Sequence, residues 1–506
     1  MPRIPNTSNL ILAVITLPLV LCPAHVFSKE LPSIEPDEIL AILQDTTTTA
    51  AEIPNKFARA EFYDQIATAL VELGYLEKAI GMADRKDNVS RDGTLKKICQ
   101  FLLEHGRILE AFQTAKKVQE RHWVAWVFQE IAPQLTDEDQ KRQALKLLQK
   151  ASTDLLQEKG FFQSPMGISM VGKIAEAQYL LGDGKASRRT VEQLWTYAKG
   201  SPDFPEAKEE YFQELALIQG NSGAMPQALA TLQFIRNVED QQTVLRRIAR
   251  NQVWEGNIPQ AQILLEKLDD PYDRDGIRKV IAKFHADQDE FQQAWTIIKQ
   301  MTHSEKKKAE ALIHIAQRQR ERRDIQSASV MLGHASHTVA SIKRSTTRAD
   351  LFGHIAQIQA KMGDSQGSRR TLTTALEAYK TIRKEKKKAP NLVNIVLAHG
   401  ELGNFQEGLA LLNTMTSEWY MNRTACWFAT IQAQKGDIEG ALRTALLSKG
   451  YDYMWRGFTL QRIAKAQAQQ GDYQAALIWA NHQLRSSEKA SAFLGIAQGL
   501  IALTNP

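Results

Sequence analysis

One spacing pattern, repeated along most of the chain, constrains its fold more than any other feature. In its last full copy, Ile463 and Ala464 are followed by Gly471 and then by Ala476. The same spacing recurs in twelve units, at steps of 32 to 43 residues. The position of Gly471 is filled in turn by Gly74, Gly106, Asp139, Gly182, Gly223, Gly256, Asp289, Arg323, Gly363, Gly403, Gly436 and Gly471. A period of this length is typical of stacked helical hairpins.

The residue types within a unit predict two helices and a sharp turn. Glycine tolerates the left-handed backbone that ends a helix, and an acidic residue after it favours the start of the next helix. The small residues let the two helices approach closely, and the isoleucine fills the groove between them. One hairpin cannot bury its apolar face alone, whereas a stack of twelve can. The Ile496-Ala497 pair repeats the first half of the pattern and predicts a C-terminal capping helix.

Three stretches carry a resemblance to a known family. They are "IAKAQAQQGDYQAAL" (463–477), "FATIQAQKGDIEGAL" (428–442) and "IAQIQAKMGD" (355–364). They resemble the tetratricopeptide repeat, and the likeness covers about residues 56–503. It implies an all-α, right-handed superhelical solenoid of about twelve helix-turn-helix repeats, whose first helices line a concave groove.

The chain departs from that family in two ways. Four of the steps are 40 to 43 residues long, which predicts helices longer by about one turn. The position of the family's aromatic residue is mostly glutamine, namely Gln178, Gln219, Gln252, Gln319, Gln359, Gln432 and Gln467. These glutamines are expected to bond the backbone or neighbouring helices, and a ladder for ligand recognition is the alternative.

Residues 1–28 resemble an export signal. Arg3 precedes a twelve-residue apolar run, Leu10–Leu21, and Val26 and Ser28 suit cleavage before Lys29. The run is shorter than the roughly 20 residues that span a bilayer, so a signal peptide is favoured over a retained anchor. No later segment is long and apolar enough to cross a membrane. The expected location is therefore periplasmic, or secreted.

Two other interpretations of the N-terminal signal remain open, and a short linker is expected to follow it. Cleavage after Ala24 is also compatible with the sequence, and Cys22 invites a lipoprotein interpretation that Leu21 before it disfavours. Residues 29–55 are expected to be a linker with a short helix over Pro36–Gln44, and residues 56–506 to form the solenoid. Only Cys99 and Cys426 would remain after cleavage, which argues against disulfides.

Neither catalytic nor metal-binding patterns are found. The chain lacks HExxH and phosphate-loop motifs, and the two histidines that share one position in neighbouring units, His314 and His354, are too few for a metal site. We therefore predict no cofactor, no metal, and a protein that is not an enzyme. A net charge of +6 is too small to favour nucleic acid as a partner.

The resemblance places candidate partner-binding residues in the groove. Ten and six residues before the turn stand Arg246 and Arg250 in one unit and Lys279 and Lys283 in the next. The following unit has Gln317. These four cations suggest a protein or peptide with acidic or carboxylate groups, and a solvated surface is the alternative. Trp126 also falls at a groove position, whereas other tryptophans, including Trp419 and Trp427, are expected in the core.

Together these features predict a function in binding rather than catalysis. The leading interpretation is an exported scaffold that binds a protein or peptide in its concave groove, in cell-envelope assembly or maintenance. The alternative is an enzyme, or an accessory subunit of one, in envelope glycan metabolism. Soluble lytic transglycosylases have a similar superhelical part. Here, however, the repeat continues to Leu503, which leaves no room for their compact catalytic domain.

Overall fold

The computed structural model describes residues 34–157, 165–200, 205–383, 388–448 and 453–504. Within these ranges it contains α-helices and one short 3-10 helix, and no strand. The predicted all-α solenoid is thus confirmed. The predicted signal peptide, residues 1–28, lies outside the described residues.

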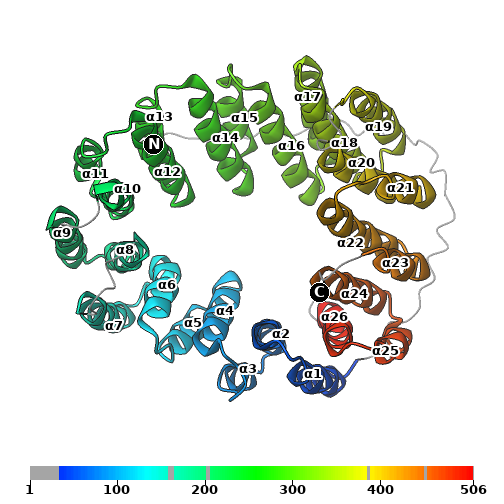
Figure 1. Cartoon of the computed structure of the whole chain (residues 1–506), viewed down its shortest axis with the longest axis horizontal. Coiled ribbons are helices and arrows are strands. Elements are labelled where there is room, and N and C mark those ends of the chain that lie inside the picture. Colours follow the sequence, from blue (N-terminus) through cyan, green and yellow to red (C-terminus); the bar gives the residue numbers. More distant parts are fainter. Residues whose placement is uncertain (1–33, 158–164, 201–204, 384–387, 449–452, 505–506) are drawn as a thin grey trace, which may run out of the picture. The chain divides into compact units, whose positions relative to one another are not determined.

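Twelve helical hairpins follow one another along the chain, and Figure 1 shows the first helix of each on the inside. The first helices are α2 Lys56–Glu72, α4 Arg91–Glu104, α6 Arg121–Ile131, α8 Pro165–Leu180, α10 Pro205–Asn221, α12 Val238–Trp254, α14 Pro271–Asp287, α16 Glu305–Glu321, α18 Ser345–Lys361, α20 Ala389–Glu401, α22 Glu418–Gln434 and α24 Tyr453–Gln469. The second helices are α3 Leu76–Ala83, α5 Ile108–Ala115, α7 Glu138–Leu156, α9 Gly184–Gly200, α11 Met225–Leu232, α13 Ile258–Leu265, α15 Phe291–Lys299, α17 Ile325–Ser341, α19 Ser365–Lys380, α21 Phe405–Leu412, α23 Ile438–Ala445 and α25 Tyr473–Asn481. Two further helices are α1 Pro36–Ala51 and α26 Ser486–Thr504.

Eleven of the twelve predicted turns have the expected left-handed backbone. Nine are glycines with φ between +69° and +88°, and the other two are Asp289 and Arg323, with φ of 61° and 62°. The prediction of a turn at Asp139 is wrong, because this residue lies inside α7. Pro133 ends α6 a turn early, in the 3-10 helix Ala132–Gln134, since its ring lacks an amide hydrogen and crowds the preceding turn. The side chain of Asp137 then starts α7 by accepting a hydrogen bond from the Gln140 amide at 2.8 Å.

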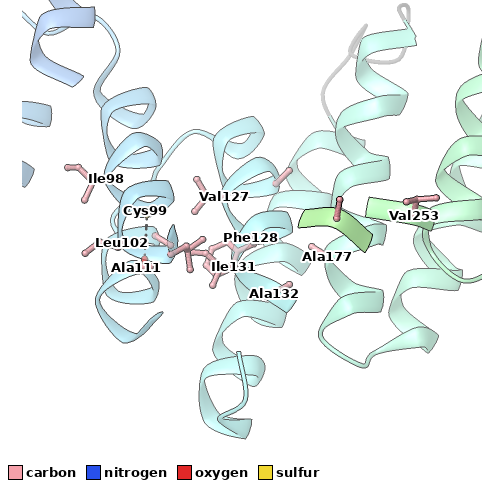
Figure 2. Packing of buried hydrophobic residues seen from close by; sticks show 14 of the residues in the cluster. Ile98, Cys99, Leu102, Ala111, Val127, Phe128, Ile131, Ala132, Ala177 and Val253 are labelled. Carbon is pink, nitrogen blue, oxygen red and sulfur yellow. Dashed lines mark hydrogen bonds between the residues drawn. The ribbon is translucent and has the colours of Figure 1, made fainter. Parts of the chain in front are cut away.

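The repeated apolar residues form the core between neighbouring helices. The residue eight positions before each predicted turn is 0–1% exposed in all twelve units. Figure 2 shows the packing in the second and third hairpins, where Ile98 and Leu102 project from the side of α4 that faces away from α6. On the other side, the ring of Phe128 on α6 meets that of Phe112 on α5 edge-on, with 6.2 Å between the ring centroids. Cys99 faces Ala111 of α5, and its Sγ donates a weak hydrogen bond to the Ala111 carbonyl at 3.4 Å. This contact confirms that the two small positions bring the helices of one hairpin together.

The extra length of the four long repeats lies entirely in their second helices. The helices α7, α9, α17 and α19 have 19, 17, 17 and 16 residues, whereas the second helices of the other repeats have 8 or 9. The difference is about two turns, so the prediction of one extra turn was too small.

The buried glutamines bond the second helix of their own hairpin. Gln178, Gln219 and Gln432 each accept a hydrogen bond from the hydroxyl of a threonine twelve residues later, at 2.9, 2.6 and 2.7 Å. Gln467 accepts one from the Trp479 indole at 2.9 Å. These four glutamines are almost fully buried. The interpretation of the glutamines as packing residues is therefore confirmed for them.

Replacing one such glutamine should destabilise the protein measurably. In Gln432→Leu, the buried Thr444 hydroxyl loses its acceptor, which should lower the free energy of unfolding by about 1–3 kcal/mol. The double variant Gln432→Leu/Thr444→Val removes both polar groups and should recover most of this loss. Urea unfolding of the three proteins measures the effect. Equal stability of the single variant and the parent protein would refute this role.

The predicted linker is largely helical. The helix α1 spans Pro36–Ala51, so it is longer than the expected Pro36–Gln44 and includes the threonine run. Thr46, Thr47 and Thr48 donate hydrogen bonds to the carbonyls four residues earlier, at 2.7, 2.8 and 3.0 Å. These bonds satisfy the hydroxyls within the helix, and tertiary contact with α26 supplies the packing that local propensity lacks.

The two ends of the described chain pack on each other. Helix α26 lies against α24 and also against α1 and α2, and Figure 1 shows α1 and α26 side by side. Three hydrogen bonds join the ends. The Tyr473 hydroxyl donates to Glu38 at 2.8 Å, and Ser486 donates to Glu52 at 3.0 Å. The third links the amides of Gln461 and Gln65 at 2.9 Å. The contacts between successive hairpins thus close into a ring.

The ring closes through a thirteenth hairpin made from both ends of the chain. Its first helix is α26, which carries the predicted Ile496-Ala497 pair, and its second helix is α1. The buried residues of α1 have the register of a long second helix. Ile39, Leu43, Thr46, Thr49 and Ala50 match in spacing the buried Ala328, Leu332, Ala335, Thr338 and Val339 of α17. The prediction of a C-terminal helix is correct. This helix does not end the stack, however, because it packs against α1 as the first helix of a further hairpin.

Candidate functional site

The exposed side chains of the even-numbered helices form what we call the inner face. Of the predicted groove residues on α12, Arg246 is held by two carboxylates. Its guanidinium donates to Asp273 at 2.5 Å and to Glu239 at 3.1 Å. The exposed Arg250 lies 5.2 Å from the Trp254 ring centroid, within the range of a cation–π contact.

Of the two predicted lysines on α14, one is also paired with a carboxylate. Lys279 donates to Glu310 at 2.7 Å. Burial and the neighbouring Lys279 lower the pKa of Lys283. The structure therefore brings the four predicted cations into adjacent helices, together with three carboxylates, those of Glu239, Asp273 and Glu310. Their net charge is smaller than the sequence suggests.

Gln317 belongs to a different set of contacts. Its amide lies 2.9 Å from Nε2 of His354. Burial, followed by the charges of Lys361 and Lys283, lowers the pKa of His354 to about 4, so this imidazole is neutral at neutral pH. His314 contacts Asp287 at 2.8 Å. Within the described ranges, no group of three or more His, Cys, Asp and Glu side chains could hold a metal ion.

Trp126 lies on the inner face between two lysines. The indole is 38% exposed, and the ammonium groups of Lys96 on α4 and Lys173 on α8 lie 4.3 and 4.2 Å from its ring. Lys173 donates to Gln129 at 2.9 Å, and Lys96 lies 3.6 Å from Glu130. Three successive hairpins thus hold one aromatic surface and two cations together, and we call Lys96, Trp126 and Lys173 the first tryptophan cluster.

A second tryptophan cluster lies on α22 and α24, where the sequence had suggested core packing. Trp419 and Trp427 are 49% and 41% exposed. The Arg423 guanidinium lies 5.3 and 5.4 Å from their rings, and that of Arg462 lies 6.0 Å from Trp427. The expectation that Trp419 and Trp427 are core residues is wrong. Residues 419, 423 and 427 recur every four positions, which places them on one helix face, and this spacing could have revealed the cluster.

Buried polar groups link the first cluster to neighbouring hairpins. Gln129 donates to the buried Glu176 at 2.5 Å, and Asn221 donates to the same carboxylate at 2.7 Å. Burial raises the pKa of Glu176. Asn251 continues the chain by donating to Asn221 at 3.2 Å. These bonds order side chains along α6, α8, α10 and α12, and so present the cluster on a preorganised surface.

The successive hairpins thus define an all-α solenoid. No protein-family model matches the sequence, and no curated protein matches it. Within the described ranges, no helix has the length and apolar character needed to cross a bilayer.

Three solved structures illustrate the likeness to helical repeats. Yeast Tom70 is 11% identical, with 82% of this chain and 97% of that chain covered and a TM-score of 0.32. The human IFIT1 dimer is 12% identical, with 92% of this chain and 100% of that chain covered and a TM-score of 0.30. Cut9–Hcn1 of the APC/C is 15% identical, with 92% of this chain and 93% of that chain covered and a TM-score of 0.28. Similarities this low carry no information about what the present chain binds.

Proposed function

We propose that the protein is an exported scaffold whose inner face binds a protein or peptide partner, in assembly or maintenance of the cell envelope. The observation that carries this proposal is the pair of tryptophan clusters. Exposed tryptophan and arginine are the residues that most often dominate the energy of protein interfaces. Both clusters combine an aromatic surface with cations, which suits a segment that carries apolar and acidic side chains.

Capture from an envelope extract tests the proposal. The double variant Trp126→Ala/Trp427→Ala removes one anchor from each cluster. Loss of two such anchors should weaken partner capture at least tenfold, since each contributes on the order of 1–2 kcal/mol. Ile478→Ala on the outer helix α25 is the matched control, because Ile478 is also exposed. Equal capture by both variants would contradict the proposed binding face. Turnover of purified cell-wall glycan would favour the alternative of an envelope enzyme.

Export makes a separate prediction. When the full chain is produced in a bacterium with a C-terminal tag, the protein in the envelope fraction should begin at Lys29, or at His25 after the alternative cleavage. A variant with arginine at Leu12 and Leu17 interrupts the apolar run and should remain full length in the cytoplasm. Mass spectrometry of the intact proteins distinguishes these forms. An envelope protein that retains Met1 would exclude cleavage.

A further inference from the structure

A largely apolar cavity lies where the two ends of the chain meet. Its volume is ≈ 710 Å³, within the range typical of sites for small molecules. One wall comes from the segment after α1 and from α2, and the other from α24 and the start of α26. The apolar lining residues are Ile53, Pro54, Ala58, Phe62, Gly457 and Phe458.

Several polar side chains around this cavity already have partners. The Gln461 amide donates to Gln65 at 2.9 Å and to Gln498 at 3.0 Å, and Ser486 donates to Glu52 at 3.0 Å. A peptide entering the cavity would bring backbone groups that need hydrogen-bond partners, and burying them without partners is costly. A hydrocarbon chain brings no such groups. The lining therefore favours a hydrocarbon chain over a peptide.

A second cavity of ≈ 470 Å³ adjoins the first and is lined by more cations than the first, to which Arg485 contributes one. The two share Glu61, Gln65, Phe458 and Gln461 as lining residues. The second cavity adds three cations, Lys97, Arg462 and Lys465, and the carboxyl group of Asp64. Three cations thus face the two carboxyl groups of Glu61 and Asp64.

The carboxyl group of Asp64 loses its charge as the pH falls toward 6, and above that pH the three cations still outnumber the two carboxylates. Burial raises the pKa of Asp64 to about 6, although the Thr94 hydroxyl donates to it at 2.6 Å. The balance of charge in the second cavity is therefore positive, which favours an anionic group beside the apolar cavity.

We infer that the two adjoining cavities bind a fatty acid, with its chain in the apolar cavity and its carboxylate beside Lys97 and Lys465. Because both ends of the chain form the walls, the site exists only when α26 packs on α1 and α2. The bound chain would bury apolar surface on both sides of this junction, so the ligand should also stabilise the closed ring.

Displacement of the fluorescent fatty acid cis-parinaric acid by oleate tests the inference on the full chain. Oleate should displace the probe, and oleyl alcohol, which has the same chain without a charge, should do so at least tenfold less well. Lys97→Gln/Lys465→Gln should weaken oleate at least tenfold and leave oleyl alcohol unchanged. Lys97 is exposed and Lys465 is half-buried, so this variant should fold. Ala58→Trp fills the apolar cavity and should abolish binding of both ligands.

Three results would overturn the inference: no binding of the probe, equal displacement by oleate and oleyl alcohol, or unchanged oleate binding by a folded Lys97→Gln/Lys465→Gln variant. The single variant Trp126→Ala, which leaves the contact between Trp427 and the cavity residue Arg462 intact, should bind oleate normally. Failure of the fatty-acid site is therefore distinguishable from failure of partner binding on the inner face.

Discussion

Replacing Gly495 by alanine should destabilise the protein, although alanine is the better helix former. A Cβ at Gly495 would lie 2.0 Å from the Gln461 carbonyl oxygen on α24, and one at Gly499 would lie 2.6 Å from that of Lys465. The obstacle is backbone, so no side-chain rotation relieves it. We expect Gly495→Ala to lower the free energy of unfolding by about 2 kcal/mol or more. Thermal unfolding measures this change.

Gly333 provides the matched control for this prediction. It also lies inside a helix, α17, and a Cβ there would meet nothing within 4 Å. Gly333→Ala should therefore stabilise the protein by about 0.5–1 kcal/mol, through helix propensity alone. The same glycine-to-alanine substitution is therefore expected to lower the free energy of unfolding at Gly495 and to raise it at Gly333. If Gly495→Ala raised the melting temperature as Gly333→Ala does, the close approach of α24 and α26 would be excluded.

Shortening Leu43 in α1 should open the thirteenth hairpin. Leu43→Ala leaves a cavity against α26 and should cost about 2–5 kcal/mol at this contact, because Leu43 is only 2% exposed. Since α1 lies at one end of the described solenoid, it can detach without global unfolding. We therefore expect faster amide hydrogen exchange in both α1 and α26. A larger radius of gyration in solution scattering should accompany the opening.

Leu332→Ala is the control for this second prediction. Leu332 has the same register in α17 and the same 2% exposure, but α17 packs on α16 and α18 and is joined to both of them by the chain. This variant should lose stability without faster exchange in α1 or α26. If Leu43→Ala left the exchange of α26 unchanged, α1 would be a passive linker.

The repeat pattern predicted most of the local structure. The turns at glycine required only the left-handed backbone that glycine adopts easily, and the isoleucine and alanine positions required only helical spacing. Asp139 was misassigned because a match in spacing outweighed Pro133, a local signal that ends α6 early. The threonine run in α1 favours a linker by sequence alone because threonine is a weak helix former, and its contact with α26 is not local in sequence.

The candidate site was less predictable than the fold. Arg246, Arg250, Lys279 and Lys283 do lie on adjacent helices, but Asp273 and Glu310, which neutralise part of their charge, come from neighbouring hairpins. The first tryptophan cluster likewise depends on Lys96 and Lys173, which are 77 residues apart in sequence (173 − 96). A single unit carries no sign of such pairs.

By itself, then, the sequence determined the all-α class, the unit of two helices and the residues that pack within each unit. These properties depend on neighbours a few residues apart, which periodicity reports directly. Only the tertiary structure decided that α26 and α1 form one hairpin, and where charged and aromatic side chains of different units meet. Small rotations between successive units accumulate around the solenoid. Whether its ends meet is therefore a property of all the hairpins together, and no single repeat encodes it.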